Sequence, residues 1–222
     1  MPRQNLIYLA SVILVLSTFT ACTAQAERRD DIDTKSSNST TTQTTTPNPE
    51  LKSRPNKKTV TDEWTQRQLP VTLFGARGGF SFTTYYPESD FVVESGASDE
   101  GMGVWFYSKA SGKKYESAYV HFFFPAKPTT LEGMRRAVIG KRGLMEANKW
   151  TVKRRSQNVP YRWAKERIDF EQPKGNQSIM GTVYIGEYKG KAFRATEHFP
   201  ADYGDGFAPR ASIILKELQL KK

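Results

Sequence analysis

Few side chains in this 222-residue sequence have the types and spacing that chemistry requires. The two histidines, His121 and His198, stand far apart, and neither belongs to an HxH or HxxxH pair or has a cysteine nearby. Metals such as zinc are usually held by closely spaced groups of such ligands, so we expect no metal site. His198 could form an acid–base pair with Glu197 or Asp202. The alternative is one packed and one surface histidine.

Nucleophile and phosphate-binding motifs are also missing from the sequence. It has no Gly-x-Ser-x-Gly elbow, and Gly101-Met102-Gly103 lacks the third glycine of a dinucleotide-binding loop. The pairs Asp90/Glu94 and Asp202/Asp205 offer the two carboxylates that a glycosidase needs, but exposed acidic loop residues are far commoner than catalytic pairs. We therefore expect no catalytic residue, no cofactor and no enzyme activity.

Cys22 is the only cysteine, and the residues before it have the order of a secretory signal peptide. Residues 1–5 include a cation, residues 6–19 are mostly apolar, and small residues lie just before the cysteine. This order predicts a signal peptide over residues 1–21, since the apolar run is too short for a comfortable membrane span. An ordinary secreted or type II anchored protein, with the cysteine there by chance, is the alternative.

The tetrapeptide Phe19-Thr20-Ala21-Cys22 resembles a lipobox, the processing motif of bacterial lipoproteins. The resemblance implies that the Cys22 thiol is acylated, by palmitate or a similar chain, and that Cys22 becomes the new N-terminus. Two or three acyl chains hold a protein on a membrane far better than one does. We therefore expect a membrane anchor at Cys22 and an extracytoplasmic location, either periplasmic or at the cell surface.

The composition changes after the cysteine. Residues 36–49 are rich in Ser, Thr and Pro and contain no apolar residue that could seed a core. Such segments bury too little surface to offset chain entropy. We predict a disordered tether over residues 22–59, followed by one globular domain over residues 60–222, which is an ordinary domain length.

The predicted domain has strand signals at regular intervals. Stretches rich in aromatic and β-branched residues alternate with turn residues, and the links between the last three stretches are short enough to force antiparallel pairing. The predicted strands cover residues 80–86, 103–107, 117–124, 149–155, 161–170, 178–187 and 192–199.

Two helices interrupt or follow these strands. Thr129-Thr130-Leu131-Glu132 has the pattern of a capping box, and helical spacing of apolar residues then continues to about Ala147. A second apolar stripe runs from Phe207 to Leu218. Both stripes must pack on a sheet. The predicted fold is therefore α+β, with one antiparallel sheet of about six to seven strands covered by helices as an α/β/α sandwich.

This layout resembles the PsbP-like family, including its bacterial lipoprotein members. The resemblance lies in the signal and tether, the Phe-x-Phe-x-x-Tyr-Tyr-Pro strand over residues 80–87, the Thr130-Leu131-Glu132 helix start, the long meander, and the aromatic-proline turn over residues 199–203. It implies an α/β/α sandwich that acts as a non-enzymatic accessory or binding module.

The chain is basic, with a formal net charge of +10, and its cations cluster in one part of the sequence. In a cytoplasmic protein this would suggest nucleic acid, which an exported lipoprotein rarely meets, so we expect none. Anionic headgroups, acidic envelope polymers or an acidic partner protein fit better. A solvated face that serves solubility is the alternative. The residues predicted to form a basic docking face are Arg135, Arg136, Lys141, Arg142, Lys153, Arg154 and Arg155.

Two main functional hypotheses follow. The first is a membrane-anchored binding or accessory module that docks to an acidic partner through the basic face. The second is a small-ligand carrier or weak hydrolase with a cleft between the sheet and its helices. A structural envelope protein without a defined ligand is a third possibility. Ionic strength separates the first two, because salt screens exposed charges and leaves apolar contacts intact.

Overall fold

The computed structural model describes residues 54–76, 80–175 and 177–221. Cys22, the predicted signal peptide and nearly all of the predicted tether lie outside these residues. Arg54 and Pro55 already contact the folded unit: the Arg54 guanidinium bonds to Glu217, and the Tyr85 hydroxyl donates to the Pro55 carbonyl at 2.7 Å.

The described residues form eleven strands and three helices. The strands are β1 (Lys57–Thr61), β2 (Gln68–Ala76), β3 (Ser81–Tyr86), β4 (Phe91–Ser98), β5 (Gly101–Ala110), β6 (Lys113–Pro125), β7 (Thr151–Ser156), β8 (Ala164–Lys174), β9 (Gln177–Tyr188), β10 (Lys191–Pro200) and β11 (Gln219–Lys221). The helices are α1 (Leu131–Ile139), α2 (Leu144–Ala147) and α3 (Gly204–Lys216), and a 3-10 turn, η1 (Ala201–Tyr203), leads into α3.

The strands lie in two antiparallel sheets, one of seven strands in the order β4-β5-β6-β10-β9-β8-β7 and one of four in the order β1-β2-β3-β11. The predicted α+β class is confirmed, as is the antiparallel meander of β8, β9 and β10. The prediction of a single sheet is wrong. The strands β1, β2, β4 and β11 were not predicted, because they are short, polar or, in β2, interrupted by Pro70.

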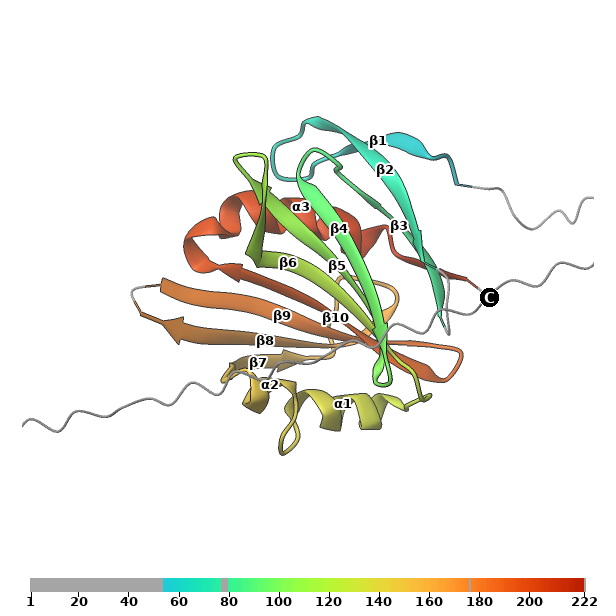
Figure 1. Ribbon diagram of the computed structural model, residues 1–222, viewed down its shortest axis with the longest axis vertical. Helices are drawn as coiled ribbons and strands as arrows, with labels where there is room; N and C mark the ends of the chain where they lie inside the picture. Colours follow the sequence, from blue (N-terminus) through green and yellow to red (C-terminus); the bar gives the residue numbers. More distant parts are fainter. Residues whose placement is uncertain (1–53, 77–79, 176, 222) are drawn as a thin grey trace, which may run out of the picture. The chain divides into compact units, whose positions relative to one another are not determined.

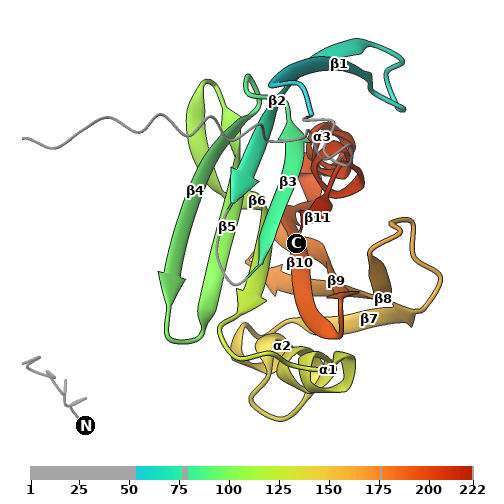
Figure 2. The same ribbon diagram turned by 90° about the vertical axis from the view of Figure 1, so that its right-hand side faces the viewer.

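Helices lie on both faces of the seven-stranded sheet (Figures 1 and 2). On one face α1 and α2 pack against β8, β9 and β10 through a core that includes Met134, Val138 and Ile168. On the other face α3 and strand β3 of the small sheet enclose an aromatic core that includes Phe82 and Phe122. Burial of these apolar faces is the main force that holds the layers together.

The predicted helix from Leu131 to Ala147 is divided into α1 and α2. Gly140 leaves the helix with extended backbone, and Arg142 adopts a left-handed conformation with φ of 60° before α2 begins. At the start of α1, the Thr130 hydroxyl accepts from the Gly133 amide at 3.1 Å. A threonine caps the helix as predicted, but one residue after Thr129, the cap that the Thr-x-x-Glu spacing implies. The glutamate of the predicted capping box, Glu132, pairs with Arg135 instead.

One buried carboxylate joins the small sheet to α3. The Asp62 side chain is fully buried in the β1–β2 turn, where one oxygen accepts from the Trp64 amide at 2.9 Å and the other pairs with Arg210 of α3. The Arg210 guanidinium also bonds to Asp90, ahead of β4, at 3.0 Å. A buried carboxylate is stable only when it is paired, so Arg210 fixes these three segments together.

We therefore expect Arg210→Met to lower the free energy of unfolding by about 3 kcal/mol, because Asp62 would be left buried without its cation. Chemical denaturation of the purified protein measures this loss. Arg162, an exposed arginine before β8, provides the control Arg162→Met, for which we expect a change within about 0.5 kcal/mol. Equal losses in the two variants would contradict the proposed role of Arg210.

Candidate functional site

The structure brings the predicted basic residues into one region. Arg135 and Arg136 lie on α1, Lys141 and Arg142 follow in the α1–α2 connection, and the other three, Lys153, Arg154 and Arg155, lie on β7. The elements α1, α2 and β7 are neighbours at the bottom of both ribbon views (Figures 1 and 2). Of the β7 cations only Arg155 points to the α1 side, so we call Arg135, Arg136, Lys141, Arg142 and Arg155 the basic surface. Lys153 and Arg154 pair with Glu171 and Asp169 on the opposite face of the sheet and are not part of it.

Glu166 links the two halves of the basic surface. Its side chain is 7% exposed, and its two oxygens accept from Arg135 Nε and from Arg155 Nη2, each at 2.7 Å. Burial alone would raise the pKa of this carboxyl, but the hydrogen bonds from Arg155 and Arg135 hold the pKa below its usual value. Glu166 therefore stays ionised and ties α1 to β7.

The other two cations of β7 also have carboxylate partners on β8. Lys153 Nζ lies 3.1 Å from Glu171, and Arg154 Nε lies 2.8 Å from Asp169, its cross-strand neighbour. These ion pairs lower the net charge of β7 and hold its side chains in fixed positions. Nothing in the sequence singles out Glu166, Asp169 and Glu171 as partners of these cations, although all three lie in or next to the predicted strand over residues 161–170.

The remaining basic residues extend further into solvent. The Arg136 side chain is 71% exposed and its Nη1 approaches Glu132 only to 4.0 Å. Lys141 and Arg142 are exposed. We call Arg136, Lys141 and Arg142 the loop cations. The Glu146 carboxylate accepts from the Arg142 backbone amide at 2.5 Å, so this loop is held in one conformation.

Both histidines are packed against aromatic rings. His121 is buried and stacks on Trp105 with 4.1 Å between ring centroids, and burial together with Arg194 lowers the pKa of His121 to about 3. His198 stacks on Tyr119, and its Nδ1 lies 2.9 Å from the Ser117 carbonyl. In residues 54–76, 80–175 and 177–221, no three His, Cys, Asp or Glu side chains group as metal ligands.

The suggested acid–base pair of Glu197 and His198 is not formed. Consecutive residues of a strand point to opposite faces, and His198 lies on the α1 side, where it also contacts Trp150. Glu197 lies on the other side, where the Tyr184 hydroxyl bonds to it. The pair failed as a prediction because sequence neighbours on a strand do not share a face.

Glu197 is an ionisable group that the sequence did not single out. Its side chain is buried, and burial raises its pKa to about 7, although Arg167 and Tyr184 partly offset this rise. Burial also raises the pKa values of Tyr161 and Tyr184, so these hydroxyls stay protonated. Glu197 and Tyr184 lie on the face of the sheet that points away from α1.

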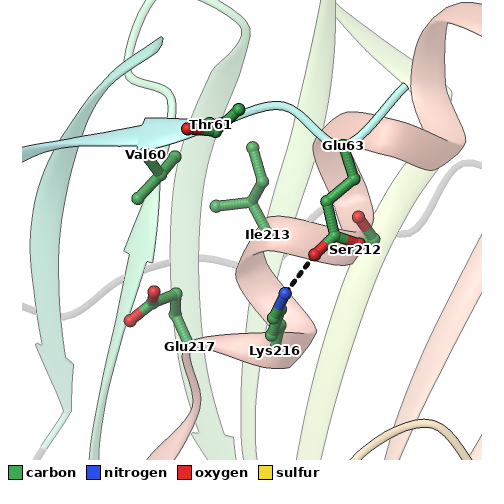
Figure 3. Close-up of a pocket in the computed structure, with 7 residues that line it drawn as sticks. All are labelled: Val60, Thr61, Glu63, Ser212, Ile213, Lys216 and Glu217. Atoms are coloured by element: carbon green, nitrogen blue, oxygen red, sulfur yellow. Dashed lines mark hydrogen bonds and ion pairs between the residues drawn. The ribbon is translucent and has the colours of Figure 1, made fainter. Parts of the chain in front are cut away.

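A pocket of about 330 Å³ lies between β1 and α3 (Figure 3). Val60 and Ile213 form its apolar part, and Glu63 and Lys216 pair beside it. Glu217, at its edge, is bonded to Arg54 and Lys58. The polar groups of this pocket are therefore largely committed to one another, and its volume is at the lower end of the range for small-molecule sites.

No protein-family model matches the chain, and no curated protein sequence matches it. In the part of the chain that the structure describes, no helix has the length and apolar character needed to cross a membrane.

The raised pKa of Glu197 predicts how stability depends on pH. The pKa of Glu197 is near 4.5 in the unfolded chain and about 7 in the folded protein. Between these two pH values the folded protein holds more protons on Glu197 than the unfolded chain does. Glu197 therefore lowers the free energy of unfolding as the pH rises from 4.5 to 7. We expect Glu197→Gln to raise the free energy of unfolding by about 3 kcal/mol at pH 8 and by little at pH 4. Denaturation curves at both pH values measure this.

The control for this prediction is Glu116→Gln, which changes an exposed carboxylate on β6. We expect the control to track the wild type at both pH values. A Glu197→Gln variant with the wild-type pH dependence would contradict the prediction.

Proposed function

We propose that this protein is a lipid-anchored extracytoplasmic binding module that docks through its basic surface to an acidic protein or an acidic envelope polymer. The observation that carries the proposal is the clustering of exposed cations from α1, the α1–α2 loop and β7 on neighbouring elements. The anchor, the signal peptide and the tether rest on the sequence around Cys22, and the proposed α/β/α sandwich and PsbP-like relationship rest on the layout of the chain.

The fixed positions of the cations support docking. Arg136 lies on helix α1, Lys141 and Arg142 lie in a loop whose backbone bonds to Glu146, and Glu166 of β8 pairs with Arg155 of β7. A cationic surface that is already ordered loses little conformational entropy when an anionic partner binds. Each basic residue close to an anionic surface contributes about 1 kcal/mol. A few loop cations together are therefore enough for reversible, salt-sensitive binding.

The alternative function, a small-ligand carrier or weak hydrolase, is supported by the pocket between β1 and α3. Its apolar part, Val60 and Ile213, would hold a ligand at high salt, whereas docking through exposed cations would be lost. Salt dependence therefore distinguishes the two proposals.

Charge reversal of the loop cations tests docking. Reversing Arg155 would place a new carboxylate against the buried Glu166 and so disturb the fold, whereas Arg136 and Lys141 are exposed. We expect the wild type to retain its partner at low salt and to release it at high salt. We expect the double variant Arg136→Glu/Lys141→Glu not to retain the partner even at low salt. Crosslinking in intact cells, followed by detergent extraction and pull-down at both salt concentrations, measures this.

A charge-matched control uses two exposed lysines away from the basic surface. Lys57 lies on β1, at the top of both ribbon views, and Lys113 begins β6 at the end remote from α1. The double variant Lys57→Glu/Lys113→Glu should keep the partner. If the two double variants behave alike, docking through the basic surface is wrong.

The proposed anchor predicts the effect of changing Cys22. Cys22→Ala removes the thiol that would carry the acyl chains, so the protein should move from the detergent-extracted membrane fraction to the soluble fraction. Mass spectrometry of the wild type should find an N-terminal peptide that begins at Cys22 and carries acyl chains. An unmodified Cys22 inside an intact N-terminal segment would support the type II anchored alternative instead.

A further inference from the structure

Two adjoining pockets lie on the face of β7, β8 and β9 that points away from α1. Their volumes are about 310 and 430 Å³, and Arg154 and Arg167 line both of them. Arg154 stands opposite Asp169, and Ser156 stands opposite Arg167, in the register of β7 and β8. Arg155, one residue along, points to the α1 side and bonds Glu166. Arg154 therefore serves a different surface from Arg155.

A single carboxylate holds both arginines of these pockets. Asp169 accepts from Arg154 Nε at 2.8 Å through one oxygen, and from Arg167 Nε at 2.6 Å and Thr182 Oγ1 at 2.9 Å through the other. Burial alone would raise the pKa of Asp169, but the hydrogen bonds from Arg167, Thr182 and Arg154 hold it below its usual value. Asp169 is therefore ionised at neutral pH and positions two guanidinium groups.

The arrangement leaves positive charge and donors available. Both arginines use Nε for Asp169, and within the described ranges no other carboxylate forms an ion pair with either of them. Two guanidinium groups that share one carboxylate retain a net positive charge. Ser156 and Asn158 line the smaller pocket, and Lys153 lines the larger one. Arginine forks of this kind match the oxygens of phosphate and carboxylate groups.

We propose that Arg154 and Arg167, positioned by Asp169, form a subsite that binds a phosphate group of the anionic partner. A phosphate has three or four acceptor oxygens and can bond to both guanidinium groups at once. The Ser156 hydroxyl donates to the Asn158 carbonyl and accepts from the Asn158 backbone amide, so the two arginines are the donors that the subsite offers. A carboxylate ligand would have only two oxygens with which to bond. The position between the two Nε atoms, which a carboxylate would suit, is already taken by the Asp169 side chain. This inference rests on the proposed docking function and names the chemistry of the partner.

Titration of the intact protein with inorganic phosphate tests the subsite. We expect phosphate to shift the NMR signals of the Arg154 and Arg167 side chains saturably, and acetate at equal ionic strength to leave them unchanged. Arg154→Lys keeps the charge but loses the fork, and since Arg154 is 63% exposed the variant should fold. We expect its phosphate affinity to fall about tenfold. Equal responses to phosphate and acetate, or unchanged affinity in Arg154→Lys, would overturn the proposal.

The double variant Arg136→Gln/Lys141→Gln separates this test from the test of docking. It removes two loop cations and leaves Arg154, Arg167 and Asp169 in place, so its phosphate affinity should equal that of the wild type. A loss of phosphate binding in this variant would contradict the subsite, whatever the pull-down shows. Failure of the pull-down with phosphate binding intact would overturn the docking proposal alone.

The source of the phosphate can be distinguished by competition. If vesicles containing phosphatidylglycerol displace inorganic phosphate from the wild type, and fail to bind the Arg154→Lys variant, the group is a lipid headgroup. If soluble polyphosphate displaces it and the vesicles do not, the group belongs to a phosphate polymer. Both results uphold the subsite, but only the second agrees with the proposed envelope polymer, and the first would replace that partner with the membrane surface. Failure of both probes to displace phosphate would overturn the assignment of the subsite to the partner.

Discussion

The buried carboxylate of Glu166 is the constraint on which the functional region depends. Burial of a charge costs several kcal/mol unless partners compensate it, and here guanidinium groups from two different elements supply the compensation. Since loss of either arginine would leave Glu166 partly unpaired, α1 and β7 are held in one relative position. The position of the loop cations follows from this, because their loop continues directly from α1.

Strand alternation then divides the charges of β7 between two surfaces. Arg155 points toward α1 and bonds Glu166, whereas Arg154 points to the opposite face and bonds Asp169. A bulge at Lys153 shifts the register between Val152 and Arg154, just before these two residues. One short edge strand thus contributes to the docking surface and to the proposed phosphate subsite, and the two can be altered separately. The six residues of β7 can serve both surfaces because its side chains alternate between the faces of the sheet, except at the bulge, where Lys153 and Arg154 line the same pocket.

Most of the large sheet could be predicted from the sequence, since β5, β6, β8, β9 and β10 alternate apolar and polar residues around clear turn signals. The small sheet could not. Its strands β1 and β11 are short and largely exposed, and they are stable only because β2, β3 and α3 lie beside them. The division of the predicted helix at Gly140 was also missed, because apolar residues continue at helical spacing through α2.

The sequence by itself determined the α+β class, the strand period, the threonine cap of α1 and the concentration of cations between residues 135 and 155. These are local properties, set by residue type and spacing along the chain. Only the tertiary structure decided which carboxylate meets which cation, that Glu197 and His198 lie on opposite faces, and that Arg154 and Arg167 share Asp169. Such contacts depend on the register and the bulges of paired strands. Register and bulges are determined jointly by residues that lie far apart in the sequence.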